Sequence, residues 1–344
     1  MRVVITGGAG FLGQAIAREC RSPRRDYGTP PELIAYDLVD AGGLPTLIGD
    51  INDGPALRRA FEGADVVVHC ATVVAWSDLR EPLLDRVNVE GTRAVVKACR
   101  DAGVRALVHT STMDVVCGDG PVRGVDESAP YPSRYLDAYG RTKAESERVV
   151  RATAEDLPFA ILRCSAMYGE ADPYKVPSIL AEARAGRLLF RVGDGRAHMQ
   201  PLYVGNAAVA VLLAVGRLLD GDPDVVGETF FLTDHPSENF FHWIEPIVKG
   251  LGYQLPTRSL PRAVALAMGT LMEGAARVMG ALGSDVQPAM TRSSVRALTE
   301  DVIVDGGRAR RCLGYEPLYD YEEAVARTVA WFNPPPPGGS PHAF

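Results

Sequence analysis

Residues 3–13 read VVITGGAGFLG, and this stretch decides the fold. The β-branched run Val3–Thr6 is typical of a buried strand, and a helical pattern follows over Gln14–Cys20. Between them, Gly7, Gly10 and Gly13 allow a tight turn, close approach of a phosphate to the backbone, and close packing of helix on strand. The start of the helix offers unpaired N–H groups to an anion. The stretch therefore predicts a dinucleotide site that includes Gly7, Gly10, Phe11, Leu12 and Gly13.

Short apolar runs alternate with helical patterns up to about residue 165, which predicts an α/β fold with a doubly wound parallel sheet. The expected strands are Val3–Thr6, Leu33–Asp37, Thr46–Ile48, Val66–Cys70, Ala106–Thr110 and Ala160–Arg163. The expected helices are Gln14–Cys20, Pro55–Phe61, Leu83–Ala102 and Ala138–Ala154, with a polar surface loop over Arg21–Pro31. Residues 1–165 thus form an NAD(P)-binding Rossmann domain.

The second half is less regular and is expected to form a smaller C-terminal substrate lobe over residues 166–332. One strand is expected there at Thr229–Thr233, and some later segments are expected to return to the first domain. The proline-rich tail at 333–344 cannot hold a helix and is expected to be disordered.

Composition excludes several classes of protein. With 344 residues, 47% of them hydrophobic, the chain is neither a disulfide miniprotein nor a disordered segment. Its net charge of −7 and the absence of a long Lys/Arg run argue against a nucleic-acid partner. No signal peptide and no metal-binding spacing is visible. We therefore expect a cytoplasmic protein with no metal and with reduced thiols at Cys20, Cys70, Cys99, Cys117, Cys164 and Cys312.

The predicted second strand ends at Asp37, 24 residues after Gly13. A carboxylate there accepts hydrogen bonds from an adenosine ribose and repels a 2′-phosphate, which favours NAD over NADP. Arg24 and Arg25 in the neighbouring loop leave NADP as the less favoured alternative. The turn after the third strand would place Asp50 and Ile51 beside the adenine.

Tyr139 and Lys143 are four residues apart and so lie on one face of a predicted helix. An ordinary tyrosine has a pKa of about 10, which is too high for a general base at neutral pH, and a nearby ammonium stabilises the phenolate. The hydroxyl-rich strand end Thr110–Thr112 would supply a third polar group. This combination predicts proton transfer beside a dinucleotide.

These motifs resemble the extended short-chain dehydrogenase/reductase superfamily over residues 3–169. The resemblance rests on TGGAGFLG, Asp37, HCAT (69–72), NVEGT (88–92), TST (110–112), YGRTK (139–143) and LRCSAMYG (162–169). It implies a catalytic triad of Thr112, Tyr139 and Lys143, a nicotinamide cofactor, and a homodimer formed through helices that include the Tyr139 helix. It also implies that the cofactor contacts Cys70, Ala71, Thr72, Asn88, Tyr139, Lys143, Arg163 and Ser165. His69 and His109 lie in apolar strands and are interpreted as buried structural histidines.

The second half resembles the 3β-hydroxysteroid dehydrogenase branch of that superfamily, above all in TDHPSENFFHW (233–243) with the later GLGY (250–253). The resemblance implies NAD-dependent oxidation of the 3β-hydroxyl of a sterol-like substrate, with decarboxylation if C4 carries a carboxylate. Arg196 or Arg163 would then hold that carboxylate. The alternatives are a 3β-hydroxy-5-ene steroid dehydrogenase/isomerase, another extended-family reductase or sugar-nucleotide epimerase, and an NAD-sensing binding protein without turnover.

The stretch Arg262–Leu282 is the longest apolar segment, but Glu273 and Arg277 interrupt it at helical spacing. An amphipathic helix packed on the lobe or on a dimer partner is one interpretation. A helix lying at a membrane surface, as a peripheral contact through 262–282, is the second. A membrane-spanning segment is the least favoured, because about 20 largely uncharged residues are needed to cross.

Overall fold

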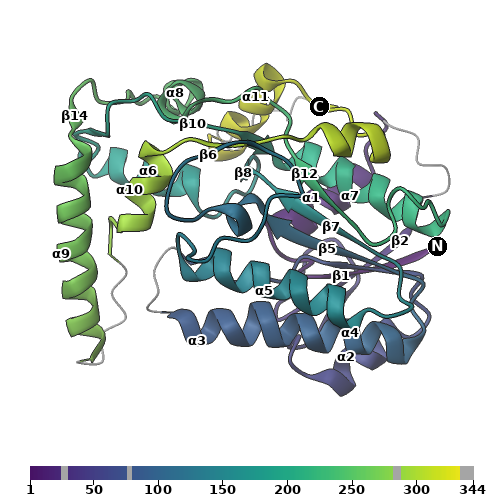
Figure 1. The fold of residues 1–344 in the computed structure, drawn as a ribbon. Helices are drawn as coiled ribbons and strands as arrows, with labels where there is room; N and C mark the ends of the chain where they lie inside the picture. The colour runs from purple at the N-terminus through teal and green to yellow at the C-terminus, as the bar shows by residue number, and fades with distance from the viewer. Residues whose placement is uncertain (25–29, 76–79, 282–287, 334–344) are drawn as a thin grey trace.

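A computed structural model of the chain describes residues 1–24, 30–75, 80–281 and 288–333 (Figure 1). Its centre is a seven-stranded sheet in the order β12-β7-β5-β4-β1-β2-β3, and every neighbouring pair is parallel. The strands are β1 (Arg2–Thr6), β2 (Glu32–Asp37), β3 (Thr46–Ile48), β4 (Val66–His69), β5 (Ala106–Thr112), β7 (Phe159–Cys164) and β12 (Glu228–Leu232). The predicted doubly wound sheet is confirmed.

Helices cover both faces of this sheet. Val3 and Ile5 pack into one core with α1 (Phe11–Cys20) and α7 (Val204–Leu219). Val4 packs into the core on the opposite face. The helices of this core are α2 (Gly54–Phe61), α4 (Gly91–Ala102) and α5 (Ala138–Thr153). Because successive side chains of a strand point to opposite faces, a continuous apolar strand is what two covered faces require.

The predicted helix Leu83–Ala102 is interrupted in the structure. It consists of α3 (Glu81–Leu84), a wider π-helical turn over Asp85–Glu90, and α4. The turn contains Asn88, whose buried side chain bonds to neighbouring segments instead of facing the helix surface. Such π-helical turns often mark functional sites. Residues 25–29 of the predicted Arg21–Pro31 loop and 334–344 of the predicted tail lie outside the described residues.

The two halves of the chain exchange strands. The strand predicted at Thr229–Thr233 is β12, which adds to the edge of the main sheet beside β7. In return β6 (Val122–Val125) joins a small sheet with β15 (Val302–Val304), β10 (His198–Met199) and β13 (Glu238–Asn239). The remaining elements are β8 (Ala166–Tyr168), α6 (Lys175–Arg184), β9 (Arg191–Val192), β11 (Pro201–Tyr203), α8 (Phe240–Gly250), β14 (Ser259–Leu260), α9 (Arg262–Ala281), α10 (Arg292–Thr299) and α11 (Tyr321–Phe332).

Helix α9 stands at one side of the molecule, next to α10 and away from the main sheet (Figure 1). Of the helices in the described ranges, none combines the length and the apolar character that crossing a bilayer requires.

Candidate active site

The glycine turn lies at the carboxyl end of β1, where the strand order reverses between β1 and β4. Ligands of doubly wound sheets bind at such a reversal. Gly7 has a φ of +73°, and a Cβ there would lie 2.7 Å from the backbone nitrogen of Ala71. A Cβ on Gly13 would lie 2.5 Å from the carbonyl oxygen of Gly7. Gly10 begins α1 without a side-chain cap, so the first N–H groups of the helix are free to bind an anion.

Asp37 ends β2 beside this turn. Its Oδ2 accepts from the backbone N–H of Ala9 at 3.0 Å, and its Oδ1 accepts from the N–H of Leu38 at 2.7 Å. Each carboxylate oxygen keeps lone-pair capacity for a ribose hydroxyl. Arg24, which would have favoured NADP, pairs with Glu323 at 2.7 Å, and Arg25 lies outside the described residues.

The two residues expected beside the adenine have structural contacts of their own. Asp50 is exposed, and its Oδ1 accepts from both the backbone and side-chain nitrogens of Asn52, which lowers the pKa of Asp50. Ile51 is only 7% exposed and belongs to the core, where a Cβ on Gly91 would lie 2.5 Å from its Cδ1. Their contact with adenine stays a prediction.

Asn88 positions the segment that follows β4. Its Oδ1 accepts from the Thr72 hydroxyl at 3.0 Å and from the Val73 N–H at 2.8 Å. Its Nδ2 donates to the Val73 carbonyl at 3.0 Å and to the Thr142 hydroxyl at 3.1 Å. The side-chain amide is thus occupied by the protein, and it holds half-buried Cys70–Thr72 next to the glycine turn.

Tyr139 lies in the first turn of α5, which begins at the cap formed by Asp137 Oδ1 on the Gly140 N–H at 2.8 Å. The tyrosine is 8% exposed, and no group in the described part of the chain hydrogen-bonds its hydroxyl. Burial raises its pKa, and the charge of Asp114 raises it further. One turn along the same face, the buried Lys143 donates from Nζ to the Thr110 carbonyl at 2.7 Å. Burial lowers the pKa of Lys143 to about 8.

Thr112 ends β5, and its hydroxyl donates to Asp114 Oδ2 at 3.0 Å while accepting from the Asp114 N–H at 3.2 Å. Burial raises the pKa of the Asp114 carboxyl. Sequence reasoning missed this acid, although its place two residues after the predicted triad threonine was an available signal.

Arg163 was expected to bind the cofactor or a substrate carboxylate, and in the structure it forms a buried ion pair with Glu147. Its guanidinium is 3% exposed and donates to both oxygens of Glu147, from Nη2 at 2.8 Å and from Nε at 3.0 Å. Ser111 and Tyr131 donate to the same carboxylate at 2.5 and 2.7 Å. The pair commits Nε and Nη2 of the guanidinium to Glu147, whereas Nη1 has no hydrogen-bond partner in the described ranges.

Ser165 follows β7, and it is 4% exposed with a hydroxyl that no group in the described ranges contacts. A buried hydroxyl without a partner is costly, so this position suits a ligand. Together with the glycine turn and Asp37, it shows that the residues present fit a bound dinucleotide.

His69 and His109 are buried and structural, as predicted. The Thr92 hydroxyl donates to the Asn88 carbonyl at 2.7 Å, so it accepts from His69 Nε2, 3.0 Å away. The Thr6 hydroxyl then donates to His69 Nδ1 at 2.7 Å. Burial, with the charge of Lys143, lowers the pKa of His69 to about 3 and also lowers that of His109. Both rings are therefore neutral beside Lys143.

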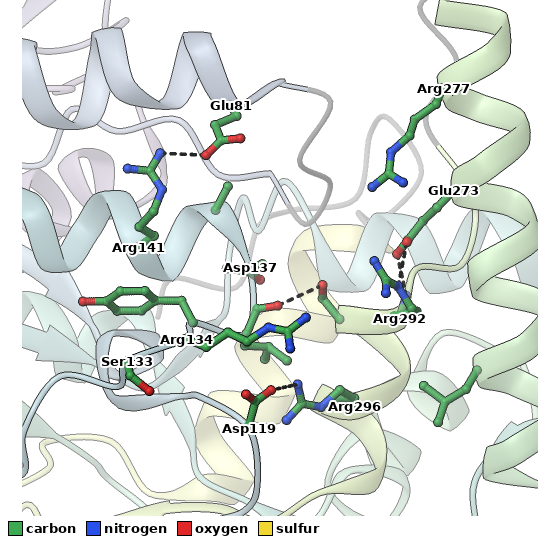
Figure 2. Close-up of a pocket in the computed structure, with 15 residues that line it drawn as sticks. Glu81, Asp119, Ser133, Arg134, Asp137, Arg141, Glu273, Arg277, Arg292 and Arg296 are labelled. Atoms are coloured by element: carbon green, nitrogen blue, oxygen red, sulfur yellow. Dashed lines mark hydrogen bonds and ion pairs between the residues drawn. The ribbon is translucent and has the colours of Figure 1, made fainter.

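Arg196 does not lie with the triad. Its side chain is 88% exposed, is 3.8 Å from Asp194, and borders a separate cavity with His235 and Trp243. A second cavity, of about 460 Å³, separates α9 and α10 from the start of α5 (Figure 2). Ala138 and Arg141 line it, whereas Tyr139 does not. Its rim carries the ion pairs Arg141–Glu81, Arg292–Glu273 and Arg296–Asp119.

A parallel sheet with a glycine turn at its reversal point and a Tyr/Lys pair on α5 defines the short-chain dehydrogenase/reductase class. Solved structures with this fold include a short-chain dehydrogenase/reductase from Agrobacterium tumefaciens with bound NAD, at 21% identity and a TM-score of 0.71, covering 97% of both chains. Another is the dTDP-glucose 4,6-dehydratase DesIV from Streptomyces venezuelae, at 23% identity and a TM-score of 0.73, covering 97% of both chains.

The chain belongs to the 3-beta hydroxysteroid dehydrogenase/isomerase family, which residues 4–262 match. It is 31% identical to a decarboxylating sterol-4-alpha-carboxylate 3-dehydrogenase of Schizosaccharomyces pombe, over 97% of this chain and 98% of that protein. It is 30% identical to the mouse protein of the same name, over 96% and 91%. The family predicted from the sequence is confirmed.

Proposed function

We propose that the protein oxidises the 3β-hydroxyl of a 4-carboxysterol with NAD and that the product loses carbon dioxide. The observation that carries the proposal is that Tyr139, Lys143 and Thr112 lie at the carboxyl ends of the parallel strands, where the glycine turn also lies. The full-length similarity to decarboxylating sterol-4-alpha-carboxylate 3-dehydrogenases supports the substrate. Asp37 supports NAD over NADP.

Each group in the site would have a separate role in the reaction. The Gly7–Gly13 turn, Asp37 and Ser165 would hold NAD, which when bound supplies the hydride acceptor. Tyr139 takes the proton from the 3β-hydroxyl, and Lys143 favours the phenolate that this requires. Thr112 orients the substrate oxygen.

Carbon dioxide loss follows from the chemistry of the product. Once C3 has lost its hydride and the hydroxyl its proton, a ketone stands next to the carbon that carries the carboxylate. The C4–carboxyl bond then breaks, and its electron pair becomes an enolate on the new ketone. No residue beyond the triad is needed for this step.

A second candidate is oxidation of a 3β-hydroxy-5-ene steroid followed by shift of the double bond. Isomerisation needs an acid/base in addition to the triad. Asp114 favours this candidate, because it is a further acid in contact with Thr112 and burial raises its pKa.

The test is NADH formation and product mass with three substrates: a 4α-carboxysterol, the same sterol without the carboxyl group, and a 3β-hydroxy-5-ene steroid. Turnover of the first with loss of carbon dioxide is expected. Conversion of the third to a conjugated enone would favour the second candidate. Inactivity with all three, despite measured NAD binding, would refute both.

We also propose a cytoplasmic homodimer that contacts membranes peripherally. The dimer is expected through helices that include α5, and light scattering of the purified protein tests it. The membrane contact is supported by the exposed apolar face of α9, which carries Val264, Met268, Leu271, Met272, Val278 and Met279.

A further inference from the structure

Lys175 is a cation close to the reacting groups that the proposed mechanism leaves without a role. It is the half-buried first residue of α6, and its Nζ donates to the Met167 carbonyl of β8 at 2.8 Å. An ammonium has three donors. Across the described ranges, Met167 is its one hydrogen-bond acceptor, and no carboxylate oxygen lies within 4 Å of Nζ. Burial lowers its pKa, as expected for a charge that is incompletely compensated.

Neither of the acids near Lys175 neutralises it by contact. Asp172 caps α6, because its Oδ1 accepts from the N–H groups of Tyr174 and Lys175, at 2.8 and 3.1 Å, and its Oδ2 from Val176 at 3.2 Å. This cap also means that the helix end itself has no free N–H for an anion. Asp114 is engaged with the Thr112 hydroxyl.

Asp114 connects Lys175 to the triad. The charge of Asp114 raises the pKa of Tyr139, and the charge of Lys175 lowers the pKa of Asp114. Tyr174, which precedes Lys175, also acts electrostatically on Tyr139. The strand pairing also places the ammonium at the end of the sheet that holds Thr112, because Met167, which accepts from Lys175 Nζ, lies three residues after Cys164, and Cys164 is paired with Thr112 across β7 and β5.

We infer that Lys175 binds the C4 carboxylate of the substrate. The inference rests on the proposed function, which brings the C3 hydroxyl to Tyr139 and Thr112. A carboxyl group on the next ring carbon then lies within a few bonds of the C3 oxygen, at the end of the sheet where Lys175 Nζ bonds to Met167. The two arginines expected for this role do not meet the requirement, since Arg163 is bound to Glu147 and Arg196 lies away from the triad.

The test compares Lys175→Met with the unchanged enzyme on two substrates with the same ring system, a 4α-carboxysterol and its neutral methyl ester. Loss of a charge-assisted hydrogen bond should lower the ratio of kcat/KM for acid over ester by about 10- to 100-fold. Lys175→Arg should restore most of the ratio. Arg196→Gln is the matched control, because it removes an exposed cation, and it should leave the ratio unchanged.

Binding gives a second measurement that does not depend on turnover. In Tyr139→Phe enzyme loaded with NAD, adding Lys175→Met should weaken binding of the acid by the same factor and leave the ester within about twofold. Equal weakening for acid and ester would show that Lys175 only supports α6 and β8, and would overturn the inference. An unchanged enzyme that turns over neither compound would instead refute the proposed function.

Discussion

Tyr139 gives the most direct residue-scale prediction. Tyr139→Phe removes the hydroxyl that takes the substrate proton and leaves the ring packed with Leu84 and Ala75. We expect turnover to fall by about 10²- to 10⁴-fold, with NAD affinity unchanged within about twofold, because the glycine turn and Asp37 are untouched. Stopped assays and fluorescence titration measure the two quantities. A variant that keeps a tenth of the rate would rule out Tyr139 as the base. If the unchanged protein shows no turnover and the variant binds NAD as the unchanged protein does, an NAD-sensing protein would be supported.

His69 gives a prediction on pH. Its pKa is about 3 in the folded protein and about 6.5 when unfolded, so the unfolded chain binds more protons between these values. The contribution of His69 to stability is therefore complete above pH 6.5 and declines as the pH falls. Relative to His69→Gln, which does not titrate, the unchanged protein should lose about 2 kcal/mol of unfolding free energy between pH 7 and pH 5. Urea denaturation of both proteins at pH 7 and pH 5 measures this loss. If the two proteins differed in unfolding free energy by the same amount at both pH values, the prediction would be contradicted.

Residues whose positions follow from local spacing could be predicted from the sequence. Gly7, Gly13, Asp37, Tyr139 and Lys143 are of this kind, since a turn, a strand end or one helical face fixes them. The contacts of Arg163, Glu147 and Lys175 depend on partners from other elements. Arg163, for example, lies in a motif typical of cofactor contact, yet its side chain faces α5 and meets a carboxylate that no pattern marks.

At the scale of elements, one buried ion pair joins α5 to β7. Glu147→Ala leaves the Arg163 guanidinium without its carboxylate, and it also leaves Ser111 and Tyr131 without an acceptor. We expect a loss of about 3–5 kcal/mol in unfolding free energy. The double variant Glu147→Leu/Arg163→Met removes both charges and should recover most of it. Chemical denaturation of both variants checks this, and a double variant as unstable as the single one would argue against the ion-pair explanation.

The elements found from sequence are the long ones with a clear period. Strands of the main sheet carry β-branched runs, and α1, α2 and α5 carry helical spacing. The small sheet was not predicted, because its strands of two to four residues lie outside the strand–helix alternation that located the equally short β3. Its pairing of β6 with β15 joins residues about 180 apart in the chain. The π-helical turn was missed because it depends on the contacts of Asn88 with the segment after β4.

At the scale of the whole molecule, the exchange of strands predicts that the halves depend on each other. A fragment of residues 1–165 lacks β12 at the sheet edge and α7 over the face that contains Val3 and Ile5. We expect this fragment to have weak near-ultraviolet circular dichroism and no cooperative thermal transition. A cooperative transition close to that of the full chain would show instead that the first 165 residues fold independently.

The apolar face of α9 gives the last prediction. Leu271 and Val278 are 74% and 63% exposed, and with the other four large apolar residues they follow helical spacing along one side. The buried residues Ala265 and Ala276 lie beside this face and turn towards the protein. A surface of this kind suits the boundary of a bilayer in which a sterol is dissolved. Leu271→Glu/Val278→Glu should therefore weaken binding to phosphatidylcholine vesicles by at least about tenfold.

Two controls separate this membrane contact from other uses of the face. Leu189 is another exposed leucine, at 58%, and it lies outside α9. Leu189→Glu should leave vesicle binding unchanged. Light scattering without vesicles should give the same mass for the α9 variant and the unchanged protein. A drop in mass for the α9 variant would show that the face covers a second copy of the chain. Equal vesicle sedimentation of the α9 variant and the unchanged protein would show that the membrane contact lies elsewhere.

Because the substrate is expected to reach the enzyme from the lipid, weakened vesicle binding should also raise KM for membrane-dissolved sterol while leaving kcat unchanged.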